Sequence, residues 1–314
     1  MEAGILTNSE LKERIEKLRK EKNALIMAHY YQRDEIQEIA DFIGDSLALA
    51  RKAAETDADI IVMCGVHFMG ETAKILCPEK KVLIPDMNAG CSLADSCDPV
   101  EFEKFVKQYP DHTVISYVNT SAAVKALTDI VVTSGNARKI VEQLPEEEKI
   151  IFGPDKNLGE YINSVTGRNM RLWNGACHVH DRFSIEKIIE LKKEHPGAKI
   201  LVHPECRRPL QLIADKVGST AALLEFASTD DSKEYIVVTE SGILFEMKKK
   251  CPQKVFIAAP AEDAECQCNE CDFMKMNTLQ KVYEALRDEK PEIKVDAEVA
   301  AKAVKSIERM LQMS

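Results

Sequence analysis

The sequence lacks the features that would place the chain in a membrane, outside the cell or on a nucleic acid. No apolar run reaches the roughly 18 residues of a membrane span. Residues 1–4 lack the basic-then-apolar layout of a signal peptide. The formal net charge is −10, so Lys and Arg are not in excess to neutralise nucleic-acid phosphates. We therefore expect a cytoplasmic protein that binds neither membranes nor nucleic acid.

Tryptophan occurs once, and Trp173 begins a stretch that gathers reactive side chains. Residues 173–180 include the thiol of Cys177 and the imidazoles of His178 and His180, after a run with no helical periodicity. This pattern indicates a strand end that opens into a polar loop. The two histidines alternate to one face of an extended chain, and either could also support a metal ligand indirectly.

Short apolar runs of strand length alternate with helical segments along the 314 residues, which suffice for two or three domains. Such strands are typical of a parallel sheet covered on both faces. The order of elements occurs three times. From the end of the first strand to a cysteine there are 62 residues (29 to 91), then 60 (117 to 177), then 63 to 68 (203 to 266 or 271).

The predicted fold class is α/β, with three αβα units related by pseudo-threefold symmetry around a central active site. Each unit has its own small parallel sheet. We expect the units at residues 1–96, 97–183 and 184–276, with a C-terminal helical segment, 277–314, packed on the first unit. Because ligands collect at the carboxyl ends of parallel strands, the polar clusters found there are expected to face the common axis.

Ten cysteines in a chain without an export signal favour metal binding or catalysis over disulfides. One thiolate from each unit could hold a zinc ion with water, or an iron–sulfur cluster with one iron that has no protein ligand. Spacing alone does not separate these, and it does not rank Cys266, Cys268 and Cys271. That trio could also form a local zinc site, although it lacks a fourth local ligand. The remaining cysteines are expected to be structural: Cys64, Cys77, Cys97, Cys206 and Cys251.

Polar pairs two residues apart follow the first strand of each unit. One such pair is more often structural, but three at the same step of a repeat favour a site. They offer imidazole, phenol and carboxylate groups for proton transfer, and an amide for orientation. The pairs are His29 with Tyr31, Tyr117 with Asn119, and His203 with Glu205.

Hydroxyl side chains near three expected helix starts form a second repeated feature. These are Ser46, Ser134 and the pair Ser219-Thr220. The commonest role of such residues is a simple N-cap. Because helix N-termini also bind carboxylates and phosphates, we expect at least some of them to hold an anionic substrate.

Read together, these motifs resemble the quinolinate synthase (NadA) family over nearly the whole chain. The similarity is carried by His29-Tyr30-Tyr31, residues 44–47, 64–74, 85–94 and 117–120, the 173–180 stretch, residues 203–206 and 218–220, and Cys271 followed by residues 274–278.

The resemblance implies three αβα domains around a pseudo-threefold axis, with a [4Fe–4S] cluster held by Cys91, Cys177 and Cys271. It implies the condensation of iminoaspartate with dihydroxyacetone phosphate to quinolinate, with loss of phosphate and two waters, in NAD biosynthesis. An aspartate oxidase or dehydrogenase is the implied source of iminoaspartate. Many relatives space the last cysteines as Cys-x-x-Cys-x-x-Cys; this chain departs from that, which leaves the role of Cys266 and Cys268 open.

By the same resemblance, Tyr31, Tyr117 and Glu205 are expected to move protons, with Glu205 the best candidate for the general base, and His180 to act near the cluster. The expected substrate-binding residues are His29, Ser46, Asn119, Ser134, His203, Ser219 and Thr220. Two other classes of function remain. One is a zinc-dependent lyase or hydrolase on the same scaffold, and the other is a thiol sensor or metal carrier that uses only the 266–271 loop.

Overall fold

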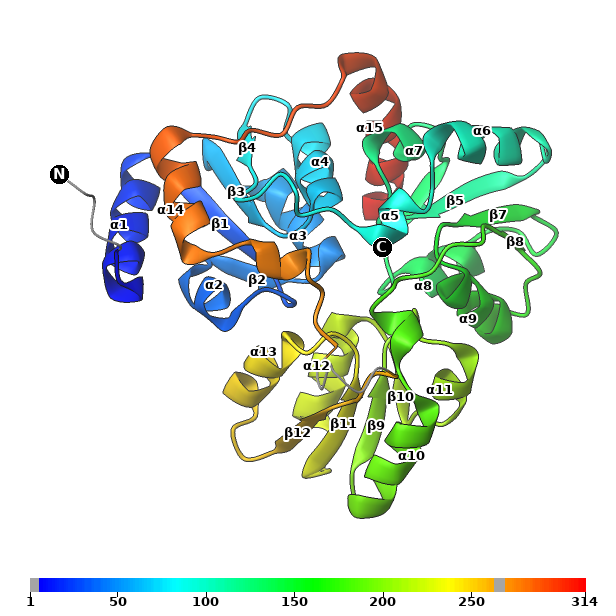
Figure 1. Cartoon of the computed structure of the whole chain (residues 1–314). Coiled ribbons are helices and arrows are strands. Elements are labelled where there is room, and N and C mark those ends of the chain that lie inside the picture. Colours follow the sequence, from blue (N-terminus) through cyan, green and yellow to red (C-terminus); the bar gives the residue numbers. More distant parts are fainter. Residues whose placement is uncertain (1–5, 263–268) are drawn as a thin grey trace. The chain divides into compact units, whose positions relative to one another are not determined.

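The computed structural model describes residues 6–262 and 269–314 (Figure 1). By contacts the chain divides into two units, Met1–Cys91 with Asp272–Asp296, and Ser92–Cys271 with Ala297–Ser314. The described residues form three four-stranded sheets in which all paired strands are parallel. Helices flank each sheet, so the prediction of an α/β fold with three small parallel sheets is confirmed.

The first unit holds one sheet, in the order β2-β1-β3-β4. Its strands are β1 (Ala24–His29), β2 (Phe42–Gly44), β3 (Ile60–Cys64) and β4 (Lys81–Leu83). Its helices are α1 (Asn8–Glu21), α2 (Asp34–Ile39), α3 (Ser46–Glu55), α4 (His67–Leu76), the 3-10 turn η2 (Met274–Met276) and α14 (Leu279–Asp288). Strand β3 is buried along its whole length, and α1 and α14 complete the core through Ile15 and Leu286. Burial on both faces explains the continuous apolar runs of β1 and β3.

The second unit holds two sheets, in the orders β6-β5-β7-β8 and β10-β9-β11-β12. The strands of the first are β5 (Thr113–Tyr117), β6 (Ile130–Val132), β7 (Ile150–Gly153) and β8 (Arg171–Leu172). Those of the second are β9 (Lys199–Val202), β10 (Lys216–Val217), β11 (Glu234–Val238) and β12 (Val255–Ala258). The helices are α5 (Ser92–Asp95), α6 (Pro99–Lys107), α7 (Ala122–Lys125), α8 (Ala137–Gln143), α9 (Lys156–Thr166), η1 (His180–Arg182), α10 (Ile185–Glu194), α11 (Arg208–Leu212), α12 (Thr220–Thr229), α13 (Ile243–Lys250) and α15 (Ala297–Met313).

All three sheets have the same topology, with the second strand, then the first, third and fourth. An aspartate just before the second strand also recurs: Asp41, Asp129 and Asp215. Its carboxylate accepts a hydrogen bond of 2.7 to 2.8 Å from the backbone N–H of the residue fifteen positions earlier. Its backbone N–H donates to the carbonyl of that same residue. This pair of bonds sets the second strand beside the first in every copy.

A second repeated set of hydrogen bonds stabilises the turn after the first strand of each sheet. Gln37, Lys125 and Gln211 each donate from a side-chain nitrogen to the carbonyls seven and five residues earlier. The Lys125 ammonium is fully buried and takes the place of an amide. Because these turns carry the polar pairs, the scaffold holds those side chains in defined positions.

Several details differ from the sequence prediction. Residues 42–44 form the short strand β2, which the sequence analysis did not anticipate. Cys77 and Cys251, taken as unmatched, occupy the same position at the C-terminal ends of α4 and α13. Their thiols face the carbonyls of Ala53 and Ala227. Their role is structural, as expected, but it is a repeated one.

The C-terminal segment does not pack as predicted. Helix α14 packs against α1 in the first unit, whereas α15 packs against β6 and α7 in the second. The hydroxyl of Ser306 in α15 donates to the carbonyl of Lys125. The prediction that 277–314 packs on the first unit is therefore wrong for α15. The unit boundaries after residues 96 and 183 stay predictions.

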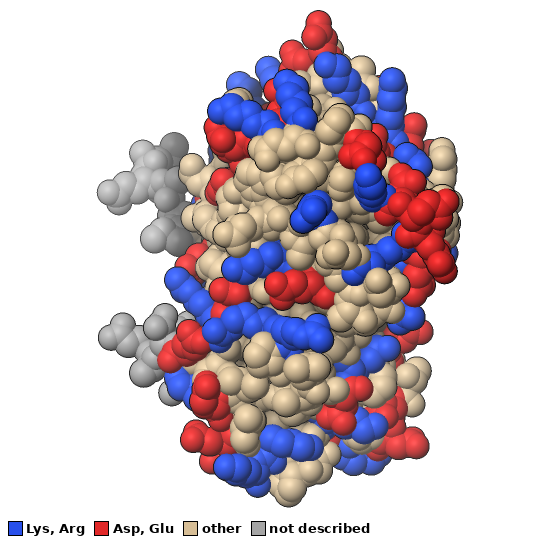
Figure 2. All heavy atoms as spheres, turned by 90° about the vertical axis from the view of Figure 1, so that its right-hand side faces the viewer, with Lys and Arg blue, Asp and Glu red and all other residues tan. Residues whose placement is uncertain are grey.

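The surface fits the acidic composition. Figure 2 shows Lys and Arg side chains intermingled with Asp and Glu over the face that it presents. None of the helices in the described part of the chain combines the length and apolar composition that a bilayer span requires.

Candidate active site

The two histidine pairs lie in tight turns at the ends of β1 and β9. The Nδ1 atom of His203 accepts from the backbone N–H of Glu205 at 3.4 Å, and that of His29 accepts from Tyr31 at 3.2 Å. In both turns the first residue's carbonyl also accepts from the N–H three residues on. Each histidine thus folds back over its own turn, and the strand alternation we expected does not apply.

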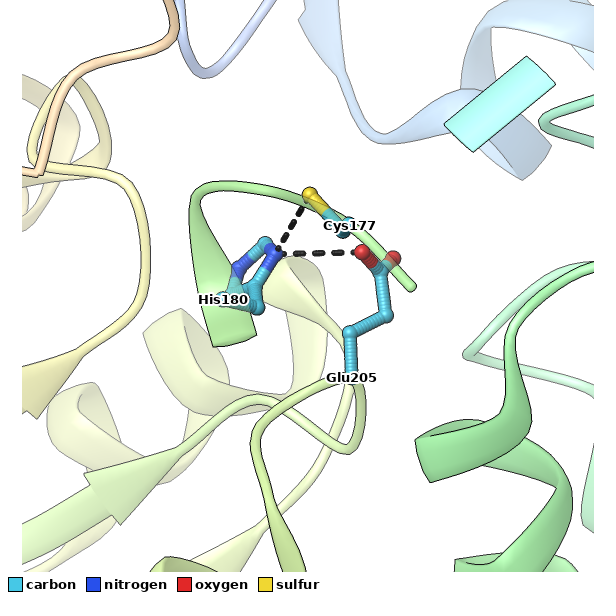
Figure 3. Close-up of side chains that lie close together, drawn as sticks. All are labelled: Cys177, His180 and Glu205. Atoms are coloured by element: carbon cyan, nitrogen blue, oxygen red, sulfur yellow. Dashed lines mark hydrogen bonds and ion pairs between the residues drawn. The ribbon is translucent and has the colours of Figure 1, made fainter. Parts of the chain in front are cut away.

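Glu205 lies at the centre of the buried polar cluster in the second unit. Its Oε1 accepts a hydrogen bond of 2.5 Å from the Tyr117 hydroxyl, and its Oε2 lies 3.1 Å from Nδ1 of His180 (Figure 3). His203 Nδ1 lies 3.7 Å from Oε1, and the rings of His180 and His203 stack at 4.5 Å. Glu205 is only 3% exposed. The structure thus brings together four side chains that the sequence predicted for the site.

The surroundings of Glu205 keep it ionised. Burial alone raises the pKa of a carboxyl group, but His180, His203 and the Tyr117 hydroxyl together outweigh burial and lower the pKa of Glu205 to about 2. At neutral pH the side chain is therefore a carboxylate with a hydroxyl and an imidazole within hydrogen-bond reach. These contacts, rather than the lowered pKa, connect three groups between which a proton could move.

Cys177 and His180 lie on one helical turn that leads into η1. The N–H of Asp181 donates to the carbonyl of Cys177, and Nδ1 of His180 lies 3.3 Å from the Cys177 sulfur. His180 Nε2 lies 2.9 Å from the Thr239 hydroxyl. His178 instead pairs with Ser92, the residue after Cys91, at 2.5 Å. The expectation that the two histidines share one face is wrong, because the segment is helical.

Two buried carboxylates hold the backbone at predicted cluster ligands. Asp155 accepts from the N–H of Cys177 at 3.1 Å, and Glu240 accepts from that of Cys271 at 3.1 Å. Each also accepts from an N–H at the start of the helix that follows it, α9 or α13. Burial and then the charge of Glu205 raise the pKa of Asp155 well above its ordinary value. The two cysteine loops are thus anchored in the same way.

The predicted substrate-binding residues of the second unit lie near this cluster or at helix starts. Ser134 lies 3.3 Å from Nε2 of His203. Ser219 is the N-cap of α12, where its hydroxyl accepts from the N–H of Ala222 at 3.3 Å, and Thr220 after it is buried. The Oδ1 atom of Asn119 is buried and has no hydrogen-bond partner among the described residues. A polar ligand could satisfy that oxygen only through a donor group.

The remaining predicted residues lie in the first unit. The rings of His29 and Tyr31 meet edge to face at 4.5 Å, and the ammonium of Lys275 binds the carbonyl of Tyr31. Ser46 is the first residue of α3, and the helix cap is instead Asp45, whose carboxylate accepts from Ala48. The N-cap interpretation of Ser46 is therefore wrong, and its hydroxyl is not committed to that cap.

The eight described cysteines separate by burial. Five are buried, and the three predicted cluster ligands, Cys91, Cys177 and Cys271, are partly exposed. Burial raises the pKa of the Cys64 and Cys97 thiols to about 12, so these two stay protonated and inert. Cys266 and Cys268 lie outside the described residues. The three predicted ligands are thus the accessible cysteines among the described residues.

Sequence reasoning missed several residues that shape the site. Asp155, Thr239 and Glu240 directly follow the third strands of their sheets, and Asn157 donates to the carbonyl of Glu205. The rule that ligands collect at strand ends could have found the first three. Trp173, in contrast, packs against Phe102 and Phe105 and has no contact that suggests chemistry.

The comparison with known sequences decides the family. The sequence pattern of the NadA family, described as "Quinolinate synthetase A protein", matches residues 13–312. This chain belongs to the NadA family. It is 54% identical over 309 residues to the quinolinate synthase of Chloroherpeton thalassium, a match that covers 98% of this chain and 96% of the relative. It is 56% identical over 300 residues to that of a Nostoc species, covering 96% and 92%. The resemblance to the NadA family inferred from the motifs is confirmed.

Proposed function

We propose that this chain is a quinolinate synthase that condenses iminoaspartate with dihydroxyacetone phosphate, releasing phosphate and two waters, in NAD biosynthesis. Membership of the NadA family over nearly the whole chain is the observation that carries the proposal. The equation balances in atoms without any oxidant or reductant. The chemistry therefore consists of proton transfers, bond formation between the two substrates and loss of leaving groups, which the buried acid–base cluster is suited to serve.

Cys91, Cys177 and Cys271 would hold the [4Fe–4S] cluster of this enzyme. Their partial exposure supports this ligand set, as do the matched carboxylates that bind the N–H groups of Cys177 and Cys271. A further support is the contact between Ser92 and His178, each the residue after a ligand cysteine. When bound, a cluster iron with an open coordination position supplies Lewis-acid activation of a hydroxyl or carbonyl oxygen.

The protein's own groups then have distinct roles. Glu205 takes protons during enolisation, imine formation and the dehydrations, and the Tyr117 hydroxyl on its Oε1 donates or relays them. His180, oriented by Thr239, offers a second proton-transfer group beside Cys177. Tyr31 has the corresponding role in the first unit.

The anionic groups of the substrates need donors. We propose that His29, Ser46, Asn119, Ser134, His203, Ser219 and Thr220 bind the carboxylates and the phosphate. Ser219 and Thr220 begin α12, a helix of ten residues whose N-terminal N–H groups favour anions. An aspartate oxidase or dehydrogenase would supply the iminoaspartate, and the cytoplasmic location stays a prediction.

Anaerobic purification followed by activity and metal analysis tests the proposal. With iminoaspartate generated by an aspartate oxidase and with dihydroxyacetone phosphate present, we expect quinolinate and phosphate in equal amounts. The active protein should contain iron and sulfide. Zinc without sulfide, together with absence of quinolinate, would instead support a zinc-dependent lyase or hydrolase.

Asp155→Asn tests whether the buried carboxylate positions a cluster ligand. The two oxygens of Asp155 accept from the N–H groups of Cys177 and Leu158. An Asn side chain has one oxygen and one NH₂ group, so one of these N–H groups would face another donor. We expect cluster binding to weaken about 10-fold to 100-fold, as when groups supporting metal ligands are removed. Iron and sulfide retained during dilution against a chelator would measure this. Asp129→Asn, which changes a carboxylate that binds the N–H of Val114, is the control and should retain the cluster.

A further inference from the structure

Three potential metal ligands of different chemistry converge in the second unit (Figure 3). Nδ1 of His180 lies 3.3 Å from the sulfur of Cys177 and 3.1 Å from Oε2 of Glu205, and the three ligand atoms all lie within 4.8 Å of one another. Ligands about 2.0 to 2.3 Å from a zinc ion lie roughly 3.3 to 3.7 Å apart in a tetrahedral site. Small side-chain shifts therefore suffice for the three atoms to share one ion.

Each of these ligands is already oriented by a neighbouring group. Nε2 of His180 lies against the Thr239 hydroxyl. If the neutral ring carries its proton on Nε2 and donates it to that hydroxyl, the lone pair of Nδ1 can bind a metal. The Tyr117 hydroxyl binds Oε1 of Glu205 and leaves Oε2 to face His180. Such outer contacts are typical of sites that bind metals tightly.

The backbone and the charge of the pocket favour a cation as well. Cys177 and His180 are three residues apart on a helical turn, so their side chains lie on one side of it. The carboxylate of Asp155 holds the N–H of Cys177, and that of Asp181 binds Asn157 close by. A divalent ion would offset the negative charge of Glu205, which is buried.

We propose that this chain, when it carries no cluster, binds one divalent ion of the zinc class through Cys177, His180 and Glu205. The partly exposed side of Cys177 leaves a fourth position for water. Such an ion uses the thiolate that the cluster needs, so zinc loading and cluster loading exclude each other. This exclusion, but not the zinc site itself, rests on the proposed function. A zinc-loaded chain has lost both its cluster ligand and its proposed base.

Cobalt titration of the full chain after removal of its cluster tests the site. Co²⁺ prefers similar ligands to Zn²⁺ and reports them by its absorption. We expect one cobalt per chain, tetrahedral d–d bands and a charge-transfer band of the strength of a single thiolate, all bleached by added Zn²⁺. We also expect the zinc-loaded chain to resist reconstitution with iron and sulfide until a chelator removes the zinc.

Two variants should separate the zinc site from the cluster site. His180→Gln should weaken cobalt binding at least about 100-fold, more than loss of an outer contact, and should still take up a cluster. Cys271→Ser should lose the cluster and bind cobalt with unchanged affinity. Unfolding midpoints of both variants close to that of the wild type show that the comparison concerns folded protein.

The opposite pattern overturns the proposal. A charge-transfer band of three thiolates that disappears in Cys271→Ser and persists in His180→Gln would place the ion on the cluster cysteines. Absence of stoichiometric cobalt binding to the stripped wild type would also refute the site. Failure of the proposed function looks different, because anaerobically purified protein would then lack iron and sulfide whatever the cobalt result.

Discussion

Replacing Glu205 by Gln is expected to reduce quinolinate formation by a factor of about 10² to 10⁴ while leaving the absorption of the proposed iron–sulfur cluster unchanged. The amide keeps the size of the side chain and can still accept from Tyr117, but it cannot take up a proton at neutral pH. Turnover measured by quinolinate release, and cluster content measured as iron and sulfide, give the two readouts. The factor is large because one group serves several proton transfers of the proposed reaction.

The matched control for this change is Glu234→Gln. Glu234 begins β11 in the same unit and pairs with His195 at 2.6 Å on the protein surface. We expect its replacement to leave turnover within a factor of about 2, because partly exposed ion pairs contribute little. Normal turnover of Glu205→Gln would refute the role of Glu205 as the base. A loss of cluster in that variant would show instead that the carboxylate supports the metal site.

Elements that bury continuous apolar runs could be predicted from sequence. Strands β1 and β5 end at residues 29 and 117, as expected, and their β-branched and other apolar residues need cover on both faces. The missed strands β2 and β10 have only three and two residues. At that length no periodicity develops, and the strands are defined by their neighbours and by a preceding carboxylate.

Helix α15 shows a second limit of sequence reasoning. Its amphipathic pattern correctly indicates that one face is buried, since Ala303, Ile307 and Met310 are inaccessible. The pattern does not say which surface covers that face. We expected the first unit to cover it, but α15 contacts α7 and β6.

The candidate site was also predicted only in part from the sequence. Repetition at matched steps predicted the residues that occur at strand ends, including the Tyr117 and Glu205 that form one hydrogen bond 88 residues apart. Asp155 and Glu240 each bind two backbone N–H groups, and Thr239 contacts a ring nitrogen. Their place after the third strands could have marked them as candidates, but the sequence does not say which backbone N–H or ring each would contact.

Cys177→Ser is expected to remove nearly all bound iron and sulfide and, with them, turnover. Serine is a poor ligand for iron at neutral pH because its hydroxyl stays protonated, whereas a thiolate binds iron readily. The same change removes the sulfur that faces His180. Iron, sulfide and quinolinate measured on anaerobically reconstituted protein should all fall to background.

Cys97→Ala is the control for Cys177→Ser, because it removes a cysteine that is not a proposed cluster ligand. Cys97 lies in the same unit, is 1% exposed and packs with Phe102 and Val114 in a hydrophobic core. Its replacement should cost about 1 kcal/mol of unfolding free energy and leave cluster and turnover intact. If Cys97→Ala lost its cluster while Cys177→Ser kept it, the accessible thiols would not be the ligands. The proposed chemistry would then have no metal centre beside Glu205.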